Sequence, residues 1–266
     1  MNRQDAQGSW LGLMIGNSRL HWAWFIGETL YCAWDTDYLP ISAVEQLTHG
    51  WNGVEWVDEF FPCDFSQNNY LLPLYLASVV PSQTVIWQAY PNVQTVTLEQ
   101  LPLQGIYPTM GIDRALTLWG AGEVWGWPML VIDAGTALTF TGGDVNRCLV
   151  GGAILPGLNL QFQSLAQRTT QLPLVDFTTV TSLPPRWALS TSEAIQSGVL
   201  RTLIAGIQDF VQAWQQQFPQ SQIALTGGDR ALLLNYLQSH PSLAAKLITD
   251  PYLVFWGIRY CRNVTK

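Results

Sequence analysis

The segment VIDAGTALTF, residues 131–140, decides the fold, because an apolar strand leads into an acid, a glycine turn and a second strand. An altered copy, LMIGNSRLHW, spans residues 13–22, and Met14 lies where the later copy has Asp133. The N–H groups of a glycine turn can approach an anion closely, and neighbouring Asn, Ser or Thr side chains add neutral donors. Two such hairpins facing one cleft predict a binding site for a nucleotide triphosphate.

Either hairpin taken alone also has a simpler explanation. Gly16-Asn17 is ordinary hairpin chemistry and needs no ligand. Asp133 ends an apolar strand, where a buried carboxylate needs a cation, an Arg or a cluster of donors as partner. We favour a bound cation, and the alternative is a structural acceptor for backbone N–H groups.

Composition bounds the class of protein. A chain of 266 residues forms one large or two small domains at roughly 150 residues each. The net charge of −7 without a Lys/Arg run argues against a nucleic-acid partner. The four Cys are scattered without metal spacing, which predicts free thiols. Neither a signal peptide nor an apolar run of about 20 residues is visible, so we expect a cytoplasmic protein without a membrane partner.

Strand and helix patterns alternate along the chain and predict an α/β architecture. We expect a domain boundary near residues 115–128, and divide the chain into 1–118 and 119–266. Two similar halves would leave a cleft between them, a common place for a ligand. The predicted strands are 10–34 with a turn at Gly27-Glu28, 74–80, 93–98, 129–143, 149–157 and 222–225. The predicted helices are 43–47, 112–122, 158–165, a long helix from Thr191 or Ser192 with Thr191 as N-cap, and 230–237.

MGIDR, residues 110–114, is the second informative cluster. An acid at a helix start can simply cap it, which stabilises by about 1 kcal/mol. The functional interpretation is a general base, Asp113, beside a cationic anchor, Arg114. Phosphoryl transfer needs mainly positioning and such a base. Walker A, Gly-x-Gly-x-x-Gly and Gly-x-Ser-x-Gly motifs are all missing from the sequence, which excludes the usual P-loop, dinucleotide-binding and serine hydrolase patterns.

The ordered set of motifs resembles type III pantothenate kinase, a family of the acetate and sugar kinase, Hsp70 and actin superfamily. The resemblance covers most of the chain. Each motif is weak alone, and the order makes the set specific. The matching segments are Gly16-Asn17-Ser18, Gly111-Ile112-Asp113-Arg114, Asp133-Ala134-Gly135-Thr136, GGAILPG at 151–157, residues 191–198 and Thr226-Gly227-Gly228.

The resemblance implies duplicated actin-like (RNase H-like) domains with a nucleotide cleft, a homodimer, and transfer of the ATP γ-phosphate to pantothenate, the first step of coenzyme A biosynthesis. It makes Asp113 the catalytic base and Asp133 the ligand of a monovalent cation, K⁺ or NH₄⁺, with Mg²⁺ arriving with ATP. The implied substrate-binding residues are Tyr107, Gly111, Ile112, Arg114 and Thr191, the last reaching pantothenate across the dimer interface. The implied ATP-binding residues are Met14, Ile15, Gly16, Asn17, Ser18, Arg19, Leu20, His21, Gly135 and Thr136.

Met14 departs from the family, whose first hairpin usually reads Asp-x-Gly-Asn-Thr. Mg²⁺ takes oxygen ligands, which Met does not offer. Three explanations stay open: Mg²⁺ held by ATP and water with slower catalysis, another acid in substitution, or lost activity. The alternatives to a pantothenate kinase are therefore a non-catalytic binding or regulatory protein on the same fold, and a kinase for another small molecule.

Overall fold

The computed structural model describes residues 8–49, 71–178, 180 and 182–264. These fall into two compact units. Unit 1 comprises residues up to 102, 106–120 and the end of the chain from 254, and unit 2 comprises 103–105 and 121–253. The predicted domain division at residue 118 stays a prediction.

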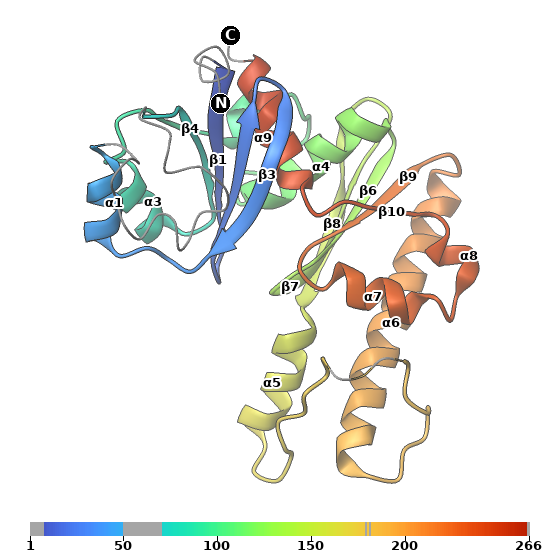
Figure 1. The fold of residues 1–266 in the computed structure, drawn as a ribbon. Coiled ribbons are helices and arrows are strands. Elements are labelled where there is room, and N and C mark those ends of the chain that lie inside the picture. Colours follow the sequence, from blue (N-terminus) through green and yellow to red (C-terminus); the bar gives the residue numbers. More distant parts are fainter. Residues whose placement is uncertain (1–7, 50–70, 179, 181, 265–266) are drawn as a thin grey trace. The chain divides into compact units, whose positions relative to one another are not determined.

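The sheet of unit 1 has five strands in the order β3-β2-β1-β4-β5 (Figure 1). β1 pairs antiparallel with β2, and β2 with β3, whereas β1–β4 and β4–β5 are parallel. The bounds are β1 Ser9–Ile15, β2 Leu20–Ile26, β3 Thr29–Thr36, β4 Leu74–Ser78 and β5 Val93–Thr95.

The sheet of unit 2 repeats this topology. Read from its β8 edge, its order is β8-β7-β6-β9-β10, with β6–β7 and β7–β8 antiparallel and β6–β9 and β9–β10 parallel. The duplication expected from the two hairpins is therefore confirmed strand by strand. The bounds are β6 Met129–Ala134, β7 Ala137–Gly143, β8 Leu149–Pro156, β9 Gln222–Thr226 and β10 Leu247–Thr249.

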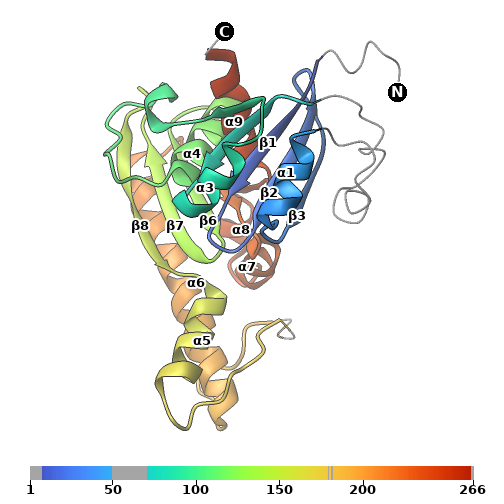
Figure 2. The ribbon, with the colours of Figure 1, turned by 90° about the vertical axis from the view of Figure 1, so that its left-hand side faces the viewer.

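Helices connect and cover the strands (Figures 1 and 2). Within unit 2, α5 and the first half of α6 lie side by side and extend beyond the sheet (Figure 2). The bounds are α1 Ile41–Leu47, α3 Pro81–Trp87, the 3₁₀ turn Leu98–Gln100, α4 Ile112–Trp125, α5 Leu158–Arg168, α6 Thr191–Gln217, α7 Arg230–Leu237, α8 Pro241–Ala244 and α9 Leu253–Val264.

Aromatic side chains fill much of the core of unit 1, which accounts for several of the thirteen Trp. Trp10, Trp22, Trp24 and Trp87 are fully buried. The rings of Trp22 and Trp34 stack with centroids 6.0 Å apart, and Trp87 meets Trp22 edge to face at 5.1 Å. Such pairs add to the large area that each ring buries.

The core of unit 2 is built around α6. The apolar face predicted from the sequence is buried at Ile195, Val199, Leu203, Ile207, Val211 and Trp214. Phe210 lies at the margin of this face, 42% exposed, and stacks on Phe140 at 4.3 Å.

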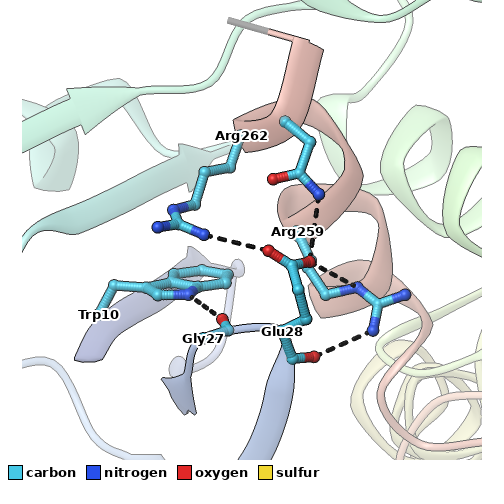
Figure 3. A network of polar contacts seen from close by, with 6 residues as sticks. Trp10, Gly27, Glu28, Arg259 and Arg262 are labelled. Carbon is cyan, nitrogen blue, oxygen red and sulfur yellow. Dashed lines mark hydrogen bonds and ion pairs between the residues drawn. The ribbon is translucent and has the colours of Figure 1, made fainter. Parts of the chain in front are cut away.

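The last helix, α9, packs within unit 1 and closes over β1 and the β2–β3 turn. The Glu28 carboxylate accepts hydrogen bonds from Arg262 at 3.4 Å and from Asn263 at 3.1 Å, and Arg259 donates to the Glu28 carbonyl at 3.1 Å (Figure 3). The Trp10 indole donates to the Gly27 carbonyl at 2.8 Å. α9 therefore completes unit 1, although unit 2 separates it from the rest of that unit in the sequence.

Four local predictions need correction. Ser190, not Thr191, is the N-cap of α6, because its hydroxyl accepts from the Glu193 amide at 3.3 Å. Pro81 does not merely end a strand: it occupies the first turn of α3, where its missing N–H has no helical acceptor. The predicted strand at 93–98 is only three residues long and is followed by a 3₁₀ turn. The helix predicted to 122 continues to Trp125. Cys32, Cys148 and Cys261 are free thiols as predicted, and Cys63 lies outside the described residues.

Candidate functional site

The first glycine turn joins β1 to β2 in unit 1. The Gly16 amide donates to the Arg19 carbonyl at 3.1 Å, and the Tyr38 hydroxyl donates to the Gly16 carbonyl. The side chains at 17–19 between them are exposed. The turn therefore presents polar groups to an incoming ligand, while Met14, at 3% exposure, lies buried behind it.

An ion pair beside this turn was not anticipated from the sequence. His21 Nδ1 lies 2.7 Å from Asp35 Oδ1, and an Arg19 guanidinium nitrogen lies 3.6 Å from Asp35 Oδ2. Burial acts to raise the pKa of Asp35, but the His21 hydrogen bond and the charges of His21 and Arg19 outweigh it and lower the pKa. Asp35 is the one acid of β3, an otherwise largely apolar strand. An acid in such a strand is the sequence signal that could have identified it.

The predicted base, Asp113, lies in the first turn of α4. Its Oδ1 accepts from the Arg114 amide at 2.8 Å. Burial raises the pKa of the Asp113 carboxyl above its usual range, although that amide and the Arg114 charge act against the rise. A carboxylate with a raised pKa is a better proton acceptor than an ordinary one.

Three neighbours shape the surroundings of Asp113. Arg114 is 7% exposed, and its guanidinium donates to the Tyr107 hydroxyl at 3.0 Å. A Cβ on Gly111 would lie 2.4 Å from Asp113 Oδ1, so only glycine leaves the carboxylate in this place. Ile112, 8% exposed, anchors the start of the helix in the core. The structure thus brings Tyr107, Gly111, Ile112, Asp113 and Arg114 together.

Val79, which follows β4, links this cluster to the first hairpin. Its amide donates to the Ile15 carbonyl at 3.1 Å, at the end of β1. Its side chain lies 4.0 Å from the Cβ position of Gly111. Val79 therefore lies next to both the carboxyl end of β1, which leads into the turn at Gly16, and the loop before Asp113.

The second glycine turn, in unit 2, surrounds Asp133 with backbone. A Cβ on Gly227, whose φ is +90°, would lie 2.6 Å from Asp133 Oδ1 and 2.3 Å from the Ala134 carbonyl. A Cβ on Gly157 would lie 2.1 Å from the Gly135 carbonyl. Three glycine segments therefore converge on the end of β6.

This donor set fits a cation held by oxygen atoms. A carboxylate and closely packed backbone carbonyls are hard ligands, and carbonyl oxygens suit K⁺ in particular. In the described parts of the chain, no three His, Cys, Asp or Glu side chains gather to bind a metal. Position 14 does not fit Mg²⁺, since a thioether offers no oxygen.

Two further predicted residues lie in unit 2, Thr136 within the second glycine turn and Thr191 at the start of α6. Thr191 is exposed at the first turn of α6. Thr136 is exposed in the second turn, and its carbonyl accepts from the Gly157 amide at 2.9 Å.

Two sheets of identical topology, each with a glycine hairpin between its first two strands, define an actin-like fold. Comparison with solved structures agrees. A Baf family transcriptional activator from Campylobacter jejuni superposes with a TM-score of 0.58 at 20% identity, covering 96% of this chain and 97% of that one. MreB 5 of Spiroplasma citri bound to AMPPNP superposes with a TM-score of 0.50 at 12% identity, covering 97% and 96%.

The chain belongs to the type III pantothenate kinase family. Residues 10–213 match the sequence pattern that members of this family share. A type III pantothenate kinase of Nostoc sp. is 58% identical over 261 residues, which cover 95% of this chain and 94% of the relative. Of the helices in the described residues, none combines the length and apolarity that a bilayer crossing requires.

Proposed function

We propose that the chain phosphorylates pantothenate with ATP to give 4′-phosphopantothenate, the first step of coenzyme A biosynthesis. The observation that carries the proposal is the Asp113 cluster: a partly buried carboxylate of raised pKa, fixed at a helix start next to a buried arginine. Family membership supplies the substrate, because relatives along nearly the whole chain are named type III pantothenate kinases.

In this mechanism Asp113 is the general base. Its carboxylate accepts the proton of the pantothenate primary hydroxyl as that oxygen attacks the γ-phosphorus, and the bond from phosphorus to the ADP oxygen breaks. Arg114 binds the anionic end of pantothenate, and the Tyr107 hydroxyl holds the guanidinium in place. Gly111 and Ile112 complete the substrate loop.

The first glycine turn, residues 14–21, is the proposed ATP-binding segment of unit 1; Met14, Ile15 and Leu20 are buried in it, and the side chains at 17–19 are exposed. Gly135 and Thr136 of the second turn are the other proposed ATP-binding residues. Asp133 would hold K⁺ or NH₄⁺, and such an ion would supply positive charge for the phosphates. Mg²⁺ would arrive bound to ATP, and Met14 offers it no oxygen ligand.

The proposed assembly is a cytoplasmic homodimer in which Thr191 of one copy reaches the pantothenate of the other. Exposed apolar side chains just before Thr191 support it: Trp187 is 86% exposed and Leu189 fully so. Side chains of this kind are costly to leave in water, and a second copy would cover them. Light scattering after size exclusion measures the mass, and a monomer at micromolar concentration contradicts the dimer.

The test of the activity is incubation with ATP, Mg²⁺, K⁺ and pantothenate, followed by mass spectrometry for phosphopantothenate. We expect product that disappears in Asp113→Asn. A folded protein that makes no product above the no-enzyme control overturns the proposal and leaves a non-catalytic binding protein. Phosphorylation of another hydroxyl compound, with pantothenate inert, leaves a different kinase.

A further inference from the structure

Met14, His21 and Asp35 form a row across the sheet of unit 1. Met14 on β1 pairs with His21 on β2, and His21 pairs with Asp35 on β3. Directly paired residues of antiparallel strands have their side chains on one face of the sheet, with Cβ atoms about 4.5–5.5 Å apart. The acid of this row therefore stands two strands away from position 14.

The contact between His21 and Asp35 fixes which imidazole nitrogen carries hydrogen. Because His21 and Arg19 keep the pKa of Asp35 low, the carboxyl is ionised and can only accept hydrogen bonds. The 2.7 Å contact is thus a bond donated by Nδ1 of His21. The orientation of the ring follows from it.

The other ring nitrogen faces the glycine turn. A Cβ placed on Gly16 would lie 3.2 Å from Nε2 of His21 and 3.5 Å from its Cδ2. The missing side chain of Gly16 leaves room for this edge of the ring. The His21 side chain is 38% exposed, so Nε2 is beside the turn amides and within reach of solvent.

We propose that Asp35 is a positioning residue for His21, whose Nε2 donates a hydrogen bond to a phosphate oxygen of ATP at the first hairpin. The inference rests on the proposed function and adds a residue to it. With Nδ1 donating to Asp35, Nε2 donates in the ring that carries both protons. Asp35 contacts the ring, Arg19 pairs with the same carboxylate at 3.6 Å, and Met14 is the strand partner of His21 on β1.

The row also gives Met14 a physical context. An acid at position 14 would stand directly beside His21 and compete with Asp35 for it. An apolar residue there leaves Asp35 as the only partner that the row offers to the imidazole. The hairpin thus holds phosphate with a cation in place of a magnesium-bound carboxylate.

The test measures binding of a non-hydrolysable ATP analogue with Mg²⁺ by isothermal titration calorimetry. The wild type is compared with His21→Gln, which keeps a neutral donor, and with Asp35→Asn. Affinity falls about tenfold in His21→Gln and about threefold to tenfold in Asp35→Asn, as for the loss of one charge-assisted hydrogen bond. Asp35→Glu restores binding relative to Asp35→Asn. In His21→Gln and Asp35→Asn the KM for ATP rises, while the KM for pantothenate stays constant.

Asp37→Asn is the matched control, since it removes the same charge from an exposed residue two positions along the chain. Wild-type affinity in His21→Gln, or an Asp35→Asn effect no larger than that of the control, overturns the inference. A wild type that binds the analogue but makes no phosphopantothenate refutes the proposed activity alone. A wild type that does not bind the analogue refutes the inference. Circular dichroism establishes that each variant is folded.

Discussion

The same substitution, Gly to Ala, should have opposite effects on stability at two helical positions of this chain. In a helix interior the exchange stabilises by about 1 kcal/mol, because Gly has the greater backbone freedom to lose. At Gly206 in α6 a Cβ meets nothing within 4 Å, so that gain stands alone. At Gly257 in α9 the Cβ would lie 2.2 Å from the Leu116 carbonyl oxygen and 2.9 Å from the Leu116 Cα.

The magnitude at Gly257 follows from this contact. A carbon normally approaches a carbonyl oxygen to about 3.3 Å, so α9 and α4 must separate by about 1 Å. Backbone cannot rotate away as a side chain end can, and overpacking of this kind costs about 1–3 kcal/mol. After the helical gain, Gly257→Ala should lower the free energy of unfolding by about 1–2 kcal/mol, and Gly206→Ala should raise it by about 0.5–1 kcal/mol.

Urea unfolding followed by far-UV circular dichroism measures both variants against the wild type. The transition midpoint should fall for Gly257→Ala and rise for Gly206→Ala, with similar slopes. A Gly257→Ala protein at least as stable as the wild type would refute the close approach of α9 to α4.

Three further predictions concern the proposed site. Asp113→Asn should lower kcat by about 10²–10⁴, the usual contribution of a general base. Asp113→Asn should also make the protein more stable than the wild type at neutral pH. Burial raises the pKa of Asp113 in the folded state, so the wild type loses stability as the pH rises through that pKa. Asn does not ionise, so the variant keeps its stability. Gly227→Ala should lower activity and weaken activation by K⁺, because its Cβ would lie 2.6 Å from Asp133 Oδ1 and φ is +90°. Met14→Asp should keep or raise activity with ATP and Mg²⁺, since it restores an oxygen ligand.

The outcomes that contradict these predictions are distinct. An unchanged kcat in Asp113→Asn contradicts the predicted role as base. A difference in stability between Asp113→Asn and the wild type that does not grow between pH 4 and pH 7 contradicts the predicted effect on stability. Gly227→Ala is contradicted by an unaltered K⁺ titration, with Gly228→Ala, whose Cβ meets nothing within 4 Å, as control. A large loss of activity in folded Met14→Asp would contradict the third prediction and show that Met14 is adapted to its site.

The sequence predicts the parts of this fold that have a strong local signal. The hairpin with VIDAGTALTF follows from an apolar run and a glycine turn, the apolar face of α6 follows from helical spacing, and both are confirmed. The predicted turn at Gly27-Glu28 is confirmed too, with φ of +60° at Gly27. These elements carry their pattern in consecutive residues, so no knowledge of the tertiary structure is needed.

Other elements depend on contacts that the sequence does not display. α3 has seven residues of which only Trp87 is buried, so it lacks an apolar period to recognise. α9 does carry a signal, with Leu253, Ile258 and Cys261 buried, but what it packs against lies more than a hundred residues earlier. The same holds for the site: Asp113 belongs to a motif, whereas Asp35 matters only through its pairing with His21 across β2 and β3.

The return of α9 to unit 1 has a consequence for the order in which the protein matures on the ribosome. Residues 121–253 are complete before α9 is made, so unit 2 can fold during synthesis while unit 1 waits for its last helix. Until then Gly12 and Phe25, which α9 meets through Phe255 and Trp256, lack their apolar cover. A nascent chain therefore offers this face to chaperones, and a chain that stops before α9 has one finished unit and one whose apolar face stays uncovered.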